Sequence, residues 1–230
     1  MTMKDHRPAN CIKTIEDLEK LIEDWGFLPF FKGRIEGFSI EELADPAIWY
    51  TEGDFSVWDW KGPVIQDLGC AYGKFFEKKA VFISREWFCD FANYRRDGYD
   101  YEGMVEDELV SYGDKRLYDL IAANEPVLSR SLKVLGNYRK GGSTGFDTSI
   151  TRLQMQGFVL VNDFKYMTDR SGHEYGWGIA EYATPEWFFG SGFYEKTYSR
   201  SPEESYDRLF RHLRELFPEA DEPDIAKMLG

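Results

Sequence analysis

The sequence predicts an α+β fold, with a winged helix-turn-helix in the C-terminal half packed against a smaller mixed α/β N-terminal module. The chain has 230 residues, of which 43% are hydrophobic, enough for a sizeable core in one large or two small domains. In the first half, helical and strand patterns are mixed. In the second half they follow the order helix, helix, turn, helix, strand, turn, strand, which is typical of a winged helix.

The N-terminal module is expected to span residues 1–98 and to contain short elements of both kinds. Its predicted helices each follow a Thr or Ser cap and span residues 14–26, 39–46 and 84–96. Its predicted strands show alternating or continuous apolar patterns and span residues 55–62 and 80–83.

Trp58 and Trp60 would share one face of the strand at residues 55–62. Such rings can stack on a nucleobase, although aromatic side chains more often pack in a core. A second, divergent winged helix is the alternative for this module. Residues 84–88 (SREWF) and 184–188 (TPEWF) are similar, and each follows a predicted strand.

The acidic stretch at residues 99–114 marks the expected boundary before a winged-helix domain at residues 99–200. The expected helix signals in this domain are an Asp114 cap, Pro126 in a first turn, an Asp147 cap and a stop at Gly157. An amphipathic pattern after Ser201 predicts a C-terminal helical extension at residues 201–230.

The third helix of this domain would bury Ile150 and expose Thr148, Thr151 and Arg152 on the opposite face. In a winged helix that outer face enters the major groove, where an arginine can donate two hydrogen bonds to guanine. The alternative is that these are ordinary exposed helix residues.

Charge favours a local rather than a global nucleic-acid interface. The net charge is −13, so the chain lacks the overall basic character that is usual for a phosphate binder. Between residues 128 and 152, however, there are five basic residues and one acid, a local balance of +4. We therefore expect Arg139, Lys140 and Arg152 to form a basic patch that binds double-stranded DNA. A protein-interaction module is the alternative that fits the overall acidity.

The remaining composition argues against several classes of protein. The three cysteines form no C-x-x-C pair, so neither a disulfide framework nor a metal site is expected, and no cofactor is implied. The first ten residues do not read as a signal peptide, and no apolar run is long enough to span a membrane. A cytoplasmic protein is expected.

Four stretches carry a resemblance that covers most of the chain: WDWKGP, FISREWFCDFANYRR, FDTSITRLQMQGFVLVNDF and YGWGIAEYATPEWFFG. The chain resembles the AlkZ-related protein family, which is similar to winged-helix DNA glycosylases of the AlkZ and YcaQ type. In those enzymes a Gln-apolar-Gln or Gln-apolar-Asp motif orients a water at the glycosidic carbon of a damaged nucleotide. The matching residues here are Gln154 and Gln156, on either side of Met155. The resemblance thus implies a glycosylase acting on alkylated bases as a further alternative.

Helix geometry argues against that catalytic role. Residues two apart on a helix point about 160° away from each other, so Gln154 and Gln156 cannot hold one water between them if the helix reaches Gly157. The sequence therefore favours nucleic-acid binding, then protein interaction, then catalysis.

Overall fold

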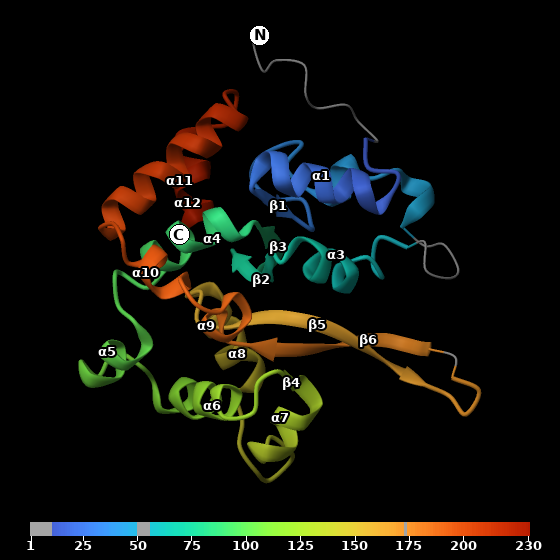
Figure 1. Cartoon of the computed structure of the whole chain (residues 1–230), viewed down its shortest axis with the longest axis vertical. Helices are drawn as coiled ribbons and strands as arrows, with labels where there is room; N and C mark the ends of the chain where they lie inside the picture. The colour runs from blue at the N-terminus through green and yellow to red at the C-terminus, as the bar shows by residue number, and fades with distance from the viewer. Residues whose placement is uncertain (1–10, 50–55, 173) are drawn as a thin grey trace.

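The chain is an α+β protein whose two halves repeat one order of elements (Figure 1). A computed structural model of the chain describes residues 11–49, 56–172 and 174–230. The N-terminal half contains α1 (Ile15–Trp25), β1 (Phe27–Pro29), α2 (Ile40–Leu43), η2 (Pro46–Ile48), α3 (Lys61–Leu68), β2 (Ala71–Phe76), β3 (Lys79–Ile83) and α4 (Arg85–Arg95). After α5 (Tyr101–Glu106), the C-terminal half contains α6 (Tyr112–Ala122), β4 (Val127–Leu128), α7 (Ser129–Leu135), α8 (Phe146–Met155), β5 (Leu160–Thr168), β6 (Glu174–Ala183) and α9 (Pro185–Phe189).

Each half builds one three-stranded antiparallel sheet with the same strand arrangement. The orders are β1-β3-β2 and β4-β6-β5, so in both sheets the last strand along the chain lies in the middle. Helix, strand, helix, helix and hairpin therefore occur twice, and this order is compatible with a winged helix in each half. The predicted α+β class is confirmed.

Several helix ends lie where the sequence signals place them. Thr14 and Asp17 form a capping box at the start of α1, and Gly26 ends the helix with φ of 73°, a conformation that favours glycine. Ser39 accepts a hydrogen bond from the backbone N–H of Glu42 at the start of α2. These local signals are reliable because each satisfies a backbone group that the helix end leaves unpaired.

The predicted strand at residues 55–62 is wrong. Residues 56–60 form turns, and Lys61 begins α3, with the backbone N–H of Val64 donating to the Trp60 carbonyl at 2.9 Å. Phe55 lies outside the described residues. Four alternating residues fit a helix start as well as a strand, so the pattern is too short to distinguish the two.

Three helix signals in the C-terminal half are also wrong. Ser111, not Asp114, caps α6, and α8 begins after Gly145, whose φ is 84°, without using Asp147 as its cap. Pro126 precedes β4 and not a helix. In each case the helix starts at another residue nearby: α6 follows Ser111, α8 follows Gly145, and β4 separates Pro126 from α7.

The two halves pack reciprocally. The third helix of each half lies against the first hairpin strand of the other, α3 against β5 and α8 against β2. Two glycines permit the close approach: a Cβ on Gly62 would lie 2.8 Å from Asp163 Oδ1, and one on Gly73 would lie 3.0 Å from Gln154 Oε1. Buried apolar residues of both halves form one core cluster. The proposed division at residues 98/99 therefore falls between segments that share a core.

A buried arginine joins the halves in the interior. Arg96 is 1% exposed and donates hydrogen bonds to Glu186 Oε1 at 2.7 Å, Tyr198 Oη at 2.8 Å and the Gly157 carbonyl at 2.6 Å. Its guanidinium also lies over the Phe158 ring, 4.4 Å from the centroid. Residues from α4, from the turn after α8 and from the segment after β6 are thus held by one side chain.

The C-terminal segment packs on the N-terminal half. It contains α10 (Phe193–Thr197), α11 (Pro202–Leu216) and α12 (Glu222–Leu229). Figure 1 shows α11 beside α4, where Asp90 pairs with Arg208 at 3.0 Å. In the described part of the chain, no helix combines the length and apolar character needed to cross a membrane.

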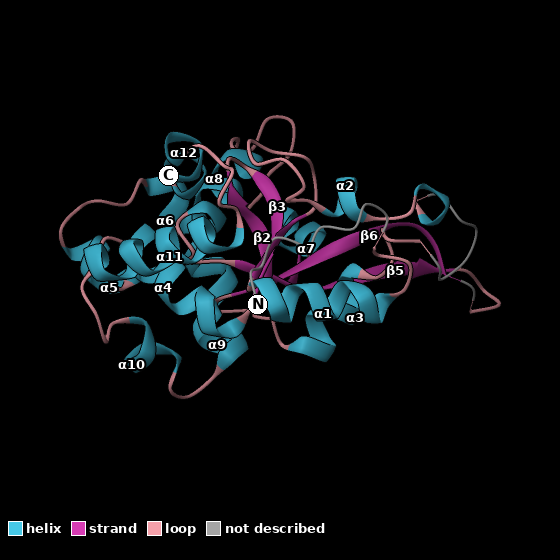
Figure 2. Ribbon diagram, turned by 90° about the horizontal axis from the view of Figure 1, so that it is seen from above, coloured by secondary structure: helices cyan, strands magenta, loops and turns pink. Residues whose placement is uncertain are grey.

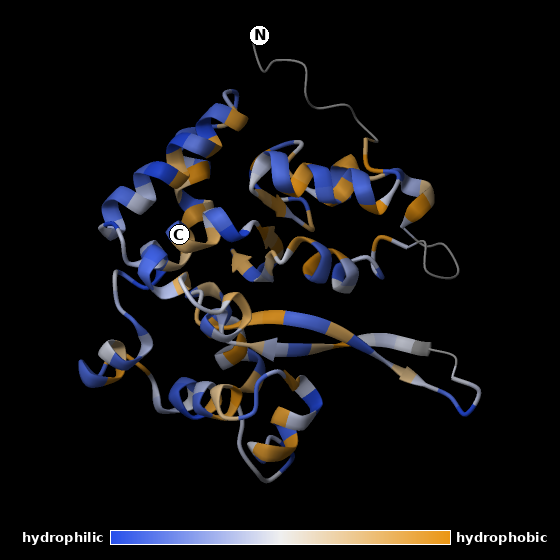
Figure 3. Ribbon diagram, viewed as in Figure 1, coloured by the Kyte–Doolittle hydropathy of each residue, from blue (hydrophilic) through white to orange (hydrophobic). Residues whose placement is uncertain are grey.

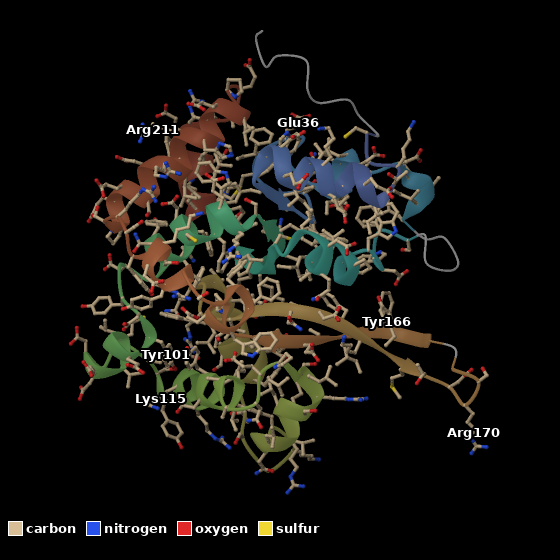
Figure 4. All side chains as sticks on the ribbon, in the orientation of Figure 1. Glu36, Tyr101, Lys115, Tyr166, Arg170 and Arg211 are labelled. Atoms are coloured by element: carbon tan, nitrogen blue, oxygen red, sulfur yellow. The ribbon has the colours of Figure 1, made fainter. Side chains whose placement is uncertain are left out.

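The β5–β6 hairpin, here called the wing, extends beyond the helices that cover its base (Figure 2). Its tip is hydrophilic (Figure 3), and Arg170 projects from it (Figure 4). A hairpin that reaches past the body of a domain is free to contact a partner.

Candidate nucleic-acid interface

The outer face of α8 is open to solvent. Thr148 and Arg152 are exposed and Thr151 is half-buried, whereas Ile150 and Leu153, on the inner face, are 3% and 1% exposed. The amphipathic assignment of this helix therefore holds, and a backbone or base could reach its outer side.

Arg152 nevertheless forms an ion pair with Asp114, a contact that the sequence pattern does not predict. Its Nε lies 2.6 Å from Asp114 Oδ2 and its Nη2 lies 3.0 Å from Asp114 Oδ1, a two-pronged contact. The Asp114 side chain is only 5% exposed. The charge of Arg152 is thus largely neutralised, and the residue is better placed to orient α8 against α6 than to bind phosphate.

Of the remaining cations, Arg139 and Lys140 lie in the turn between α7 and α8, and Arg130 lies in the first turn of α7. Arg130, Arg139 and Lys140 are exposed, and none has an acidic partner within 4 Å among the described residues. Lys133 is less free, because it lies 3.8 Å from Asp147 and 4.8 Å from the centroid of the Phe146 ring. Of the predicted patch, Arg139 and Lys140 are without an acidic partner among the described residues, and Arg130 of α7, which the patch did not include, is a third such cation.

This turn is rigidly built. Arg116 donates to the Gly136 carbonyl at 2.7 Å and to the Ser143 hydroxyl, so α6 holds both ends of it. A Cβ on Gly142 would lie 2.2 Å from the Asn137 carbonyl oxygen, which excludes any other residue there without rearrangement. A fixed turn presents Arg139 and Lys140 in a defined position.

The two glutamines differ in their burial. Gln154 is 3% exposed; its Oε1 accepts from the Lys74 backbone N–H at 3.0 Å and its Nε2 donates to the Ile150 carbonyl at 3.0 Å. Gln156 is half-buried and follows the last helical residue, Met155. Gln154 therefore joins α8 to β2, and its amide groups are already engaged by the protein.

The two tryptophans lie in different surroundings. Trp60 is 7% exposed and belongs to the core, whereas Trp58 is half-buried in a surface cluster of aromatic rings. Trp58 packs at 5.1 Å from Phe30 and edge-on at 6.3 Å from Trp177 of the wing, measured between ring centroids. Trp177 is 81% exposed. Of the predicted stacking residues, only Trp58 lies near the surface.

Lys61 was not singled out in the sequence, yet it is the central charge of this cluster. Its Nζ lies 4.6 Å from the centroid of Phe164, 4.8 Å from Trp58 and 5.7 Å from Phe30. Burial lowers the pKa of Lys61 to about 8, and the negative charge of Asp59 offsets only part of that effect. The sequence signal for this contact is the three-residue spacing of Trp58 and Lys61. That spacing brings two side chains together where the chain turns as at a helix start, but not in the strand that was predicted there.

Asp59 is oriented by the wing. Tyr166 donates to Asp59 Oδ1 at 3.0 Å, and Figure 4 shows Tyr166 on the side of the wing that faces α3. The wing and the start of α3 thus bring an amine, a carboxylate, a phenol and several aromatic rings to one surface.

The comparisons with known proteins give one match. The model of the family described as "AlkZ related" matches residues 12–230. No curated protein and no solved structure gives a match. The family match spans both halves and the C-terminal helices, and with it the cluster at Lys61 and the glutamine segment. The chain therefore belongs to the AlkZ-related family.

Proposed function

We propose that the chain binds double-stranded DNA through its C-terminal half, with the turn between α7 and α8, the outer face of α8 and the wing as the contact surface. One observation carries the proposal. Arg130, Arg139 and Lys140 lack acidic partners in the described residues, although the chain has 41 acidic and only 28 basic residues. Cations left unpaired in so acidic a chain are suited to phosphate contacts.

The family name supports a role in DNA repair. The name relates the family to AlkZ, and the resemblance seen in the sequence is to DNA glycosylases of the AlkZ type. Catalysis by the glutamine motif is not part of the proposal, because Gln154 is engaged by Lys74 and Ile150. The proposed function is thus recognition of duplex DNA in a repair context.

The test compares two triple variants of equal charge. Replacing Arg130, Arg139 and Lys140 by Ala should weaken duplex binding by about tenfold or more and make its salt dependence shallower by up to about 2.7 in log–log slope. The control replaces three exposed lysines outside the interface, Lys13, Lys20 and Lys196. Equal binding by both variants would remove the turn from the interface, and no duplex binding by the wild type would overturn the proposal.

A protein-interaction module is the second candidate, and an exposed apolar patch favours it. Tyr112, Val134 and Leu135 are 81%, 80% and 51% exposed. A shallow depression of about 430 Å³ lies beside them, lined by residues of α6 and by Leu135. Leu135→Glu should abolish concentration-dependent self-association in sedimentation equilibrium if this patch binds a second copy. A wild type that stays monomeric and binds duplex DNA would favour the first candidate.

A further inference from the structure

Lys61 occupies an unusual position for a lysine at the start of a helix. It is the first residue of α3, and rings from three separate segments surround its amine: Phe30, Trp58 and Phe164. Its amine makes no ion pair and donates no hydrogen bond to any described residue. A salt-bridged surface lysine would be held by a carboxylate, whereas the contacts of this amine among the described residues are with three ring faces, and the Asp59 charge acts on it without forming an ion pair.

These surroundings change the reactivity of the amine. Burial lowers its pKa to about 8, and the positive end of the α3 dipole acts in the same direction. An amine with such a pKa is neutral in roughly one molecule of ten at pH 7, compared with fewer than roughly one in a thousand for an ordinary lysine. A desolvated, partly neutral lysine is the form that attacks carbonyl carbon.

Aromatic rings lead from solvent to this amine. Trp177 on the wing is 81% exposed and meets Trp58 edge-on, and Trp58 lies 4.8 Å from Lys61 Nζ. The buried Trp58 Nε1 has no hydrogen-bond partner, so the ring has a free donor. A base next to an abasic site could stack on the exposed part of these rings, which would bring the ring-opened sugar aldehyde towards the amine.

We propose that Lys61 captures the aldehyde of an abasic site in DNA by forming an imine with it. The amine nitrogen bonds to the aldehyde carbon, the carbon–oxygen double bond breaks, and the oxygen leaves as water with two hydrogens from the amine. The Asp59 carboxylate, positioned by Tyr166, accepts and returns the proton during this exchange. The inference rests on the proposed function, because it takes DNA as the ligand, and it adds a covalent step that binding alone does not need.

Borohydride trapping tests the imine. The full chain is incubated with a duplex oligonucleotide that holds one abasic site, the imine is reduced to a stable secondary amine, and the adduct is mapped by peptide mass spectrometry. We expect the adduct on Lys61 and a loss of at least about tenfold in Lys61→Arg, which keeps the positive charge but cannot form this imine. Lys196→Arg, which changes an exposed lysine on α10, is the matched control. Thermal unfolding of each variant checks that it folds.

A small aldehyde separates the lysine from the DNA. With benzaldehyde and cyanoborohydride, labelling of Lys61 should reach half its maximum near pH 8, while that of Lys196 should still rise at higher pH. The charged and titratable groups in the turn before α3, on α3 and on β5 are Asp59, Asp67, Asp163, Lys165 and Tyr166, and those on α1 are Glu16, Asp17, Glu19, Lys20, Glu23 and Asp24. Labelling of Lys61 no faster than that of Lys196 would overturn the inference.

The two proposals fail in different ways. Binding of intact and abasic duplex without a trapped adduct on Lys61 would overturn the imine and leave the proposed function standing. Absence of any duplex binding would overturn both, whatever benzaldehyde does. An adduct on Lys61 that persists at full yield in the Arg130, Arg139 and Lys140 triple variant would place the DNA on the wing and not on the turn.

Discussion

At the residue scale, the two side chains that matter most are those that sequence patterns could not reveal. Lys61 and Arg96 look like ordinary surface residues in the sequence, because Lys and Arg are rarely buried. Their burial depends on distant segments: Phe164 lies over Lys61 from 103 positions along the chain, and Glu186 lies beside Arg96 from 90 positions along it. Local signals of capping and periodicity carry no information about such distant contacts.

Replacing Arg96 should strongly lower the free energy of unfolding. In Arg96→Met the Glu186 carboxylate and the Gly157 carbonyl lose their donor, and we expect a loss of about 3–5 kcal/mol in the free energy of unfolding. Arg96→Lys should not restore the lost stability, because one ammonium group cannot donate to all three acceptors that the planar guanidinium reaches. Urea denaturation measures both. Arg211→Met, at an exposed arginine whose Nε donates to the Asp207 carbonyl, should change the free energy of unfolding by less than about 0.5 kcal/mol.

His212 should make stability fall in mild acid. Burial lowers its pKa below the ordinary 6.5, while its Nε2 lies 2.8 Å from the Trp25 carbonyl and its ring stacks on Trp87. Above pH 6.5 the imidazole is neutral in both states and the full stability is present. As pH falls below 6.5 the unfolded chain takes up the proton first, so stability is lost down to the folded pKa.

The measurement is the free energy of unfolding from pH 7.5 to 5, compared with that of His212→Gln. The glutamine amide keeps a donor for the Trp25 carbonyl but does not titrate. A decline that is equally steep in both proteins would assign the acid sensitivity to carboxylates.

At the element scale, the sequence predicted most of the long helices and the strand at residues 80–83, but it misassigned residues 55–62 and did not predict β1, β2 and β4. α1 and α11 each combine a capping box at a Thr or Ser with an amphipathic stripe, α4 begins after Ser84, and all three form as expected. The predicted strand around Trp58 is wrong because turn residues before a helix can alternate in polarity by chance. The outer face of α8 was read correctly, but the neutralisation of Arg152 depends on Asp114 in another helix.

The exposed ring of the wing should serve binding and not folding. Trp177 is 81% exposed, so Trp177→Ser should change the free energy of unfolding by less than about 0.5 kcal/mol. If the wing contacts an unpaired base, the same change should weaken binding to abasic duplex by about 1–3 kcal/mol. Tyr112→Ser is a matched control, since Tyr112 is also 81% exposed but lies on α6. Equal effects of the two changes in a fluorescence anisotropy titration would contradict a role for the wing.

At the scale of the whole molecule, the repeated order of elements was only hinted at by the sequence. The SREWF and TPEWF segments both follow the middle strand of a sheet, which fits the alternative of a second winged helix. The reciprocal packing of the halves could not be foreseen, because it depends on two glycines, Gly62 and Gly73, that resemble ordinary turn residues.

Shared packing predicts that the halves will not fold separately. Residues 99–200 alone would expose the faces of α8 and β5 that β2 and α3 cover, so this fragment should show no cooperative thermal transition. A full chain cut by a protease at a site inserted between Asp107 and Ser111, in the exposed link from α5 to α6, should stay associated and unfold in one transition. Near-ultraviolet circular dichroism distinguishes the cases. A cooperative transition in the fragment would establish the boundary at residue 99 as a true domain limit.

The contact between α8 and β2 also constrains how this protein can change over evolutionary time. Gln154 bonds to the backbone of Lys74 and not to its side chain, so position 74 is free to vary while position 154 is not. Gly73 leaves the space that the glutamine occupies. A side chain at position 73 would displace Gln154, whereas a change of Gln154 would not by itself free position 73, because a Cβ there would also lie 2.8 Å from the Phe75 ring. Retention of Gln154 in this family would then follow from its bonds to Lys74 and Ile150, whether or not the residue takes part in catalysis.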